Sequence, residues 1–154
     1  MTDLPDGAPP RGLEERVRDA RGLLESGVDL WVATSGPAGP HLVPLSYLWD
    51  GSTLLLATAR TSATARNVLA DGRVRLALGR TRDVVMVDGT AIPVDLADLP
   101  TGTGDAFAAR TGFDPRELGG RYVYLQVRPR RLQAWREENE IAGRDVMRDG
   151  RWLA

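Results

Sequence analysis

The sequence predicts a mainly β protein built on a closed or nearly closed antiparallel barrel. Six or so short segments rich in apolar and β-branched residues follow one another in meander order, with turn signals between most of them. Two or three small helical patterns interrupt them, but strands do not alternate regularly with long helices, which disfavours a doubly wound parallel sheet. The length of 154 residues suits one domain with its own core.

The first third of the chain is predicted to hold one helix and three strands. Residues 1–12 are polar and rich in proline and glycine, and we expect a flexible tail ahead of a single domain over residues 13–154. Apolar residues then recur at helical spacing from Leu13 to Leu24, and Gly27 can cap this helix. Strands are expected at 28–34, 41–49 and 52–58.

Turn signals separate these three strands from one another. The segment SGPAGP (35–40) makes the first turn, and Asp50-Gly51 is a strong hairpin signal. Pro44 lacks a backbone donor, so the second strand is expected at an edge or with a bulge. Trp31 and Trp49 are interpreted as core and hairpin packing.

The rest of the chain is predicted to alternate short helices with longer strands. Ser62 or Thr61 can cap a helix that ends at Asp71-Gly72. We expect helices at 63–70 and near 105–110, strands at 73–79 and 83–95, and a strand at 121–129 that 130–135 can continue. Alternation in that last strand places Val123, Leu125 and Val127 on one face and Tyr122, Tyr124, Gln126 and Arg128 on the other. The tail 136–154 is polar, with isolated apolar anchors.

Two absent residue types and a single histidine limit the reactions that the side chains can carry out. The chain has no lysine and no cysteine, and His41 is its only histidine. This composition excludes a lysine Schiff base, a thiolate nucleophile, cysteine-ligated metal and multi-histidine metal sites. The acidic run 137–140 has no histidine partner, so no metal site is predicted. If the protein is an enzyme, we expect a bound cofactor to carry the difficult step, with no catalytic side chain assigned.

Charge and hydropathy indicate which partners and which cellular compartment to expect. The formal net charge is −1, so no global field draws it to nucleic acid or to an acidic membrane. Its polar start does not resemble a signal peptide, and no apolar run approaches the roughly 20 residues that span a bilayer. We therefore expect a cytoplasmic protein.

The segment 58–67 (TARTSATARN) is the best candidate for an anion site. A strand ends there, and hydroxyl groups and two arginines surround the start of a helix, where free N–H groups favour a phosphate. The alternative is that Ser62 only caps the helix and that Arg60 and Arg66 are solvated. Trp135, where the last strand ends, either packs at a rim or lies against a planar cofactor.

In order and spacing, these residues resemble the pyridoxamine 5′-phosphate oxidase-like split β-barrels. The likeness rests on PLSYLWDG (44–51), LLLAT (54–58), SATARN (62–67), GRVRLALG (72–79) and VMVDGTA (85–91), and it returns at PRRLQAW (129–135). The resemblance implies a six-stranded antiparallel split β-barrel of the FMN-binding type. It also implies a homodimer that uses FMN or the deazaflavin F420 and acts on a small molecule.

The resemblance also implies where the cofactor binds. The loop after the third strand holds the phosphate, the second strand faces the ring system, and a tryptophan and an arginine from the partner subunit close the site. Carried onto this sequence, these positions are Leu42, Val43, Pro44, Leu45, Ser46, Thr58, Arg60, Thr61, Ser62, Thr64, Arg66, Asn67, Trp135 and Arg144.

The sequence departs from the family at two places. Pyridoxamine phosphate oxidases carry an arginine–lysine pair just after the serine, where this chain has Ala63 and Thr64. Their tail supplies an arginine and a histidine near the places of Ile141 and Gly143. Hydride transfer between FMN or F420 and a molecule other than vitamin B6 is therefore the leading hypothesis. The alternatives are a non-catalytic flavin carrier or sensor, and a barrel without cofactor that serves in assembly.

Overall fold

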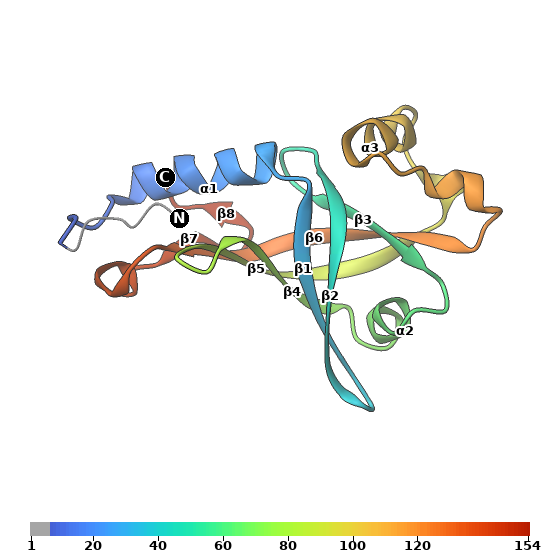
Figure 1. The fold of residues 1–154 in the computed structure, drawn as a ribbon, viewed down its shortest axis with the longest axis horizontal. Coiled ribbons are helices and arrows are strands. Elements are labelled where there is room, and N and C mark those ends of the chain that lie inside the picture. Colours follow the sequence, from blue (N-terminus) through green and yellow to red (C-terminus); the bar gives the residue numbers. More distant parts are fainter. Residues whose placement is uncertain (1–6) are drawn as a thin grey trace.

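The computed structural model describes residues 7–154 and confirms the mainly β fold (Figure 1). The helices are α1 (Leu13–Ser26), α2 (Ala63–Ala70) and α3 (Thr103–Thr111), with single 3-10 turns at η1 (Leu96–Asp98), η2 (Pro115–Leu118) and η3 (Glu138–Glu140). The strands are β1 (Asp29–Gly36), β2 (Gly39–Trp49), β3 (Leu54–Ala59), β4 (Arg73–Arg80), β5 (Asp83–Val94), β6 (Tyr122–Trp135), β7 (Asp145–Arg148) and β8 (Arg151–Trp152).

Six of the strands close into an antiparallel barrel. Their order is β3-β2-β1-β4-β5-β6, and a further pairing of β3 with β6 completes the ring. In that closing pair Leu56 lies opposite Leu125. The strands β7 and β8 continue the sheet from β6 outside the ring, so the predicted polar tail ends in a hairpin.

The main core fills the barrel. Alternate residues of each strand point inward, as the period of two requires, and Leu76, Val87 and Leu132 are fully buried there. Helices α1 and α2 pack into the same core from opposite ends, through residues such as Leu24 and Val68 (Figure 1). The amphipathic pattern of α1 is explained by this contact, and none of the helices in the described part of the chain is long and apolar enough to cross a membrane.

The predicted two-faced alternation of β6 is confirmed, but at Tyr124 the outer face is covered as well. Helix α3 covers the outer face of β3 and β6, and Phe107 meets Tyr124 edge-on with ring centroids 5.4 Å apart. Tyr124 is therefore fully buried although its neighbours Val123 and Leu125 already face the barrel interior. Alternation divides the side chains between two faces, but it does not show that both faces are covered.

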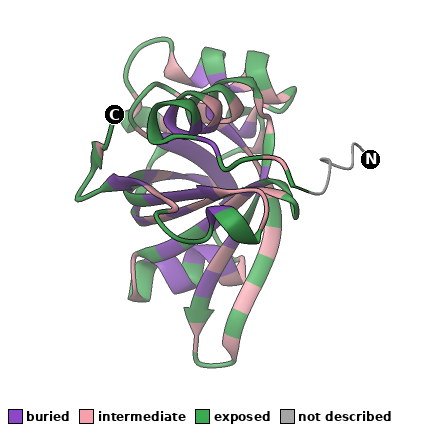
Figure 2. Cartoon of the chain, turned by 90° about the vertical axis from the view of Figure 1, so that its left-hand side faces the viewer, coloured by how far each residue is buried: buried purple, intermediate pink, exposed green. Residues whose placement is uncertain are grey.

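The second strand is an edge strand along half of its length, which confirms the expectation from Pro44. Strand β2 pairs with β3 only over Tyr47–Trp49, so Gly39–Ser46 has β1 on one side and no strand on the other within the described chain. The β1–β2 hairpin extends beyond the barrel, and exposed and half-buried residues alternate along this part of β2 (Figure 2).

The N-terminal segment differs in part from the expected flexible tail. Residues 1–6 lie outside the described residues. The segment 7–12 has no regular secondary structure, but Arg11 is buried at 8% exposure and hydrogen-bonded to Glu140, 129 positions away. This end of the tail is therefore packed against the domain.

Candidate functional site

The loop between β3 and α2 is built around hydroxyl groups. Ser62, and not Thr61, caps α2, because its Oγ accepts a hydrogen bond from the Ala65 N–H at 3.0 Å. Thr58 donates its Oγ1 proton to the same Oγ at 3.0 Å. Since Oγ accepts both bonds, the Ser62 hydroxyl proton remains available to an outside acceptor. The first N–H groups of α2, at Ala63 and Thr64, have no carbonyl partner within the helix.

The two arginines of this loop have different partners. Arg66 is exposed and donates through Nη1 to the Thr61 carbonyl at 2.7 Å, which holds its guanidinium beside the helix start. Arg60 donates through Nε to the Gly120 carbonyl at 2.8 Å and pairs with Asp95 at 2.9 Å. Within residues 7–154, Arg66 therefore has donors without a partner at the loop, whereas the charge of Arg60 is already matched by a carboxylate.

Two predicted site residues on α2 face the protein interior. The Asn67 side chain donates to the Thr34 Oγ1 at 3.1 Å, and Thr64 is 1% exposed. A Cβ on Gly36 would lie 2.1 Å from the Asn67 Oδ1, so this close approach requires glycine on β1. In this chain, the Asn67 side chain joins α2 to β1, and the Thr64 side chain is buried.

The free edge of β2 carries the five residues predicted to face a ring system. Leu42 and Pro44 are exposed on the outer face, while Val43 and Leu45 point inward and are half-buried. Ser46 donates to the Asp29 Oδ1 at 2.6 Å. The main-chain groups on the unpaired side of this edge are free to bind a flat polar ligand.

Trp135 and Arg144 lie together but far from this loop. The Arg144 guanidinium carbon is 5.7 Å from the Trp135 ring centroid, in the range of a cation–π contact. Tyr122, which pairs with Ala59 next to the loop, is at the other end of the 14-residue strand β6. Within one chain, therefore, the structure does not bring the two groups of predicted site residues together.

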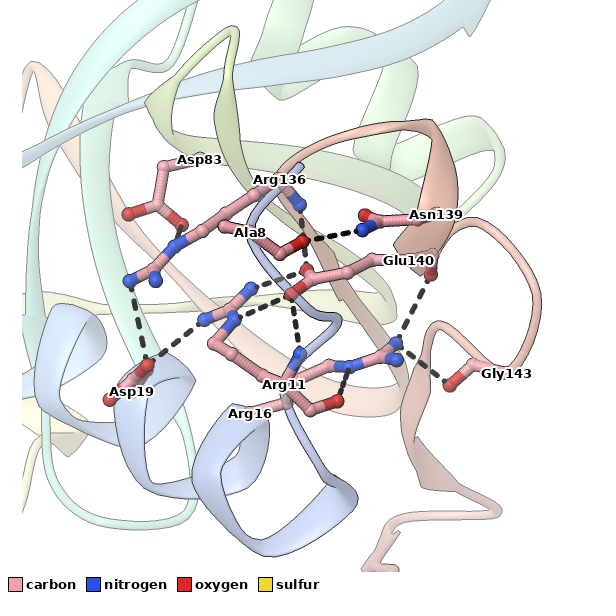
Figure 3. Close-up of polar contacts among 9 residues, drawn as sticks. All are labelled: Ala8, Arg11, Arg16, Asp19, Asp83, Arg136, Asn139, Glu140 and Gly143. Atoms are coloured by element: carbon pink, nitrogen blue, oxygen red, sulfur yellow. Dashed lines mark hydrogen bonds and ion pairs between the residues drawn. The ribbon is translucent and has the colours of Figure 1, made fainter. Parts of the chain in front are cut away.

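A buried carboxylate that the sequence analysis did not single out stands close to Trp135. Glu140 is 3% exposed and binds Arg11 through both carboxylate oxygens, at 3.0 and 2.8 Å (Figure 3). Burial alone would raise the pKa of Glu140, but the hydrogen bonds from Arg11 and from the Arg136 N–H lower it to about 2. The acidic run 137–140 was the only signal for it, and that run does not show which carboxylate is buried.

The outer face of the barrel carries one row of residues that is apolar on four strands and ends in a glutamine on the fifth. This row runs in register from Pro44 through Trp31, Ala77 and Met86 to Gln133. Trp31 is 50% exposed, so its interpretation as core packing is wrong. The row ends two residues before Trp135 on β6.

A separate cavity of about 540 Å³ lies between β4, β5, β6 and β7 and includes none of the predicted cofactor residues. Three of its four arginines already pair with aspartates: Arg73 with Asp71, and Arg131 and Arg148 with Asp145. It is therefore a weaker phosphate site than the α2 start.

Comparison with known proteins agrees with this architecture. The family model described as pyridoxamine 5′-phosphate oxidase matches residues 19–136, and no curated protein matches the sequence. A solved structure named F420 reductase is 23% identical, with a TM-score of 0.59 over 73% of this chain and 94% of that one.

Two further solved structures share the fold. The general stress protein 26 of Bacillus anthracis is 18% identical, with a TM-score of 0.58 over 79% of this chain and 95% of that one. An FAD-binding protein of Mesorhizobium loti is 18% identical, with a TM-score of 0.57 over 75% and 88%. At such identities these likenesses establish the fold.

Proposed function

This chain belongs to the pyridoxamine 5′-phosphate oxidase family, and on this premise we propose that it is an oxidoreductase that uses FMN or F420. In this proposal it transfers a hydride to or from a small organic molecule other than vitamin B6. Two similar structures carry the names F420 reductase and FAD-binding protein, which supports a cofactor of the flavin or deazaflavin class.

The observation that carries the proposal is the donor set at the start of α2. The free hydroxyl proton of Ser62, the free helix N–H groups and the exposed guanidinium of Arg66 all lie within one short loop. These are hydrogen-bond donors around a positive helix end, which is the chemistry that a phosphate group requires. The residues present therefore fit the phosphate of FMN or F420.

Each element has a distinct role in this proposal. Ser62 and Arg66 hold the phosphate, and the free main-chain edge of β2 over Leu42–Ser46 orients the ring system. When bound, the flavin or deazaflavin ring supplies the hydride chemistry. His41 is half-buried on the inner side of β2 opposite Thr34. We assign it no role as a general base, and solvent exchanges the proton.

We further propose that the working form is a homodimer. Trp135 and Arg144 lie at the far end of β6 from the phosphate loop of their own chain, so only a second copy can bring them to a cofactor bound there. The apolar row around Trp31 and Met86 offers a face for that second copy, because exposed apolar area of this kind is typical of subunit contacts.

Titration of the full-length protein with FMN and with F420, followed by cofactor fluorescence, tests the proposal. We expect saturable binding of one of the two and substrate-dependent bleaching of its absorbance. Binding without such turnover would support the carrier or sensor hypothesis instead. A protein that binds neither cofactor would refute the proposed function.

A further inference from the structure

A buried ion pair joins the N-terminal segment to the loop that follows Trp135. Arg11 uses its main-chain N–H and its Nε to bind Glu140 Oε1, both at 3.0 Å, and its Nη2 to bind Oε2 at 2.8 Å (Figure 3). The Arg136 N–H donates to Oε2 at 2.9 Å. Glu140 therefore accepts four hydrogen bonds, which compensates the cost of burying its charge.

A second arginine holds the far side of the same loop. Arg16 on α1 donates through Nη1 to the main-chain carbonyls of Glu140 and Gly143, at 3.1 and 3.0 Å. Its Nε binds the Arg11 carbonyl at 3.1 Å, so the two arginines support each other. Arg11 and Arg16 thus hold the loop 136–143 at Glu140, Arg16 also holds it at Gly143, and its start is bonded to Glu140 through the Arg136 N–H.

This loop sets the relative position of Trp135 and Arg144. Arg144 follows the clamped Gly143, and its Nη1 donates to the Ile141 carbonyl at 3.0 Å. Its own carbonyl accepts the Ala134 N–H at 2.9 Å, next to Trp135. A displacement of the loop would move the Arg144 guanidinium away from the Trp135 ring, from which it is 5.7 Å distant.

We propose that Arg11 and Glu140 are positioning residues that hold Trp135 and Arg144 in the place from which they reach the cofactor of the partner subunit. This inference rests on the proposed function and on the homodimer. Neither residue touches the cofactor. Their effect on it passes through the loop 136–143, which makes the segment before α1 a functional part of the site.

A double-mutant cycle tests whether the effect passes through the loop. We expect Arg11→Met to weaken binding of FMN or F420 roughly ten-fold, the loss expected from a misplaced charged contact. In a background that carries W135A and R144A, the same substitution should change affinity less than two-fold, because the residues it positions are gone. Arg11→Lys should restore part of the affinity.

Hydrogen exchange of the free protein provides a readout without cofactor. Arg11→Met should speed exchange of amides in 136–145 and leave those of α2 and β2 unchanged.

Two further variants guard these measurements. Because Arg11→Met leaves a buried carboxylate unpaired and can unfold the chain, the double variant R11M/E140Q repeats both measurements without a buried charge. Arg82→Met is the matched control, since Arg82 meets the same loop at Glu137 through an exposed 3.3 Å pair and should change neither readout.

The outcomes separate this inference from the proposed function. Unchanged exchange in 136–145, or an equal loss of affinity with and without Trp135 and Arg144, would overturn the positioning role. Faster exchange throughout the chain would also overturn it, because Arg11 would then support the fold as a whole. Wild-type protein that binds neither cofactor would refute the proposed function. It would also remove the cofactor contact that Trp135 and Arg144 are proposed to make, whatever the exchange measurements show.

Discussion

At the start of α2, two arginines of the same loop lie in different electrostatic surroundings. Arg60 is bound to the Gly120 carbonyl and to Asp95, whereas Arg66 makes one hydrogen bond, to Thr61, among the described residues. A ligand phosphate would have to compete with Asp95 for Arg60 but would find Arg66 free. At the scale of single residues, Arg66 is therefore the stronger candidate for a phosphate contact.

We predict that Arg66→Ala weakens binding of the cofactor by roughly ten-fold or more, since a charged hydrogen bond contributes about 1.5–3 kcal/mol. The free energy of unfolding should change by less than about 0.5 kcal/mol, because the side chain is exposed. Fluorescence titration and urea unfolding measure the two quantities. Arg73→Ala, at an exposed arginine paired with Asp71, is the control. Wild-type affinity of the Arg66 variant for both FMN and F420 would place the phosphate elsewhere.

We also predict a stability change with pH that depends on Glu140. Its pKa is about 2 in the folded protein against an ordinary value of 4.5, so its stabilisation is fully present above pH 4.5 and is lost as the pH falls toward 2. The loss should be on the order of 3 kcal/mol. Urea unfolding of wild type and Glu140→Gln between pH 7 and pH 2 measures it, and the two curves should approach each other toward the low end of this range.

Asp71 provides the matched control for this pH effect. Its pKa is also lowered to about 2, by hydrogen bonds from Arg73, but the pair is exposed to solvent. Asp71→Asn should therefore leave the pH dependence of stability nearly unchanged. If the Glu140 and Asp71 variants behaved alike, the buried ion pair would not be a source of stability.

At the scale of elements, two buried tyrosines show how helices are attached to the barrel. Tyr47 on β2 and Tyr124 on β6 are both 0% exposed. The Tyr47 hydroxyl donates to the Leu24 carbonyl at 3.0 Å and so binds the last turn of α1, and a Cβ on Gly27 would lie 2.3 Å from it. The Tyr124 hydroxyl, under α3, has no hydrogen-bond partner among the described residues.

These two tyrosines should respond oppositely to removal of the hydroxyl. Tyr47→Phe should destabilise the protein by about 1–3 kcal/mol, because it removes the hydroxyl donor from the buried Leu24 carbonyl of α1. Tyr124→Phe should be neutral or slightly stabilising, because it removes a buried polar group that forms no bond. Denaturant unfolding of the two variants measures the difference. A loss at Tyr124 as large as that at Tyr47 would mean that its hydroxyl has a partner, such as a bound water.

At the scale of the whole molecule, the outer face of the barrel is where a second copy is proposed to pack. Strand β5 alternates Val85 and Val87 with Met86, and the structure places Val85 and Val87 in the core. Met86 therefore lies on the outer face, in the same row as Trp31.

We predict that wild-type protein is a dimer by light scattering at micromolar concentration and that Trp31→Glu makes it monomeric, because a carboxylate would be buried without a partner at the interface. The monomer should keep its fold and lose cofactor affinity, since the partner no longer supplies Trp135. Leu69→Glu, at a 68% exposed position on α2 outside this face, should remain dimeric. A stable, folded wild-type monomer would refute the homodimer.

The sequence by itself determined the features that depend on neighbours along the chain. Helix α2 lies at 63–70 as predicted, because the Ser62 cap and the Asp71-Gly72 end are local signals. The strand positions and the free edge at Pro44 also follow from local pattern and from a missing N–H. In the candidate site, the cap and the helix start could be predicted for the same reason.

Only the tertiary structure decided the features that join distant segments. The closure of the barrel pairs Leu56 with Leu125, and Arg11 meets Glu140 across 129 positions, so no local pattern encodes either contact. Alternation could not show that α3 buries Tyr124 or that Trp31 is exposed, because a period of two names the faces of a strand but not what covers them. Burial and ion pairing depend on which surfaces meet in three dimensions, and only the tertiary fold determines which surfaces these are.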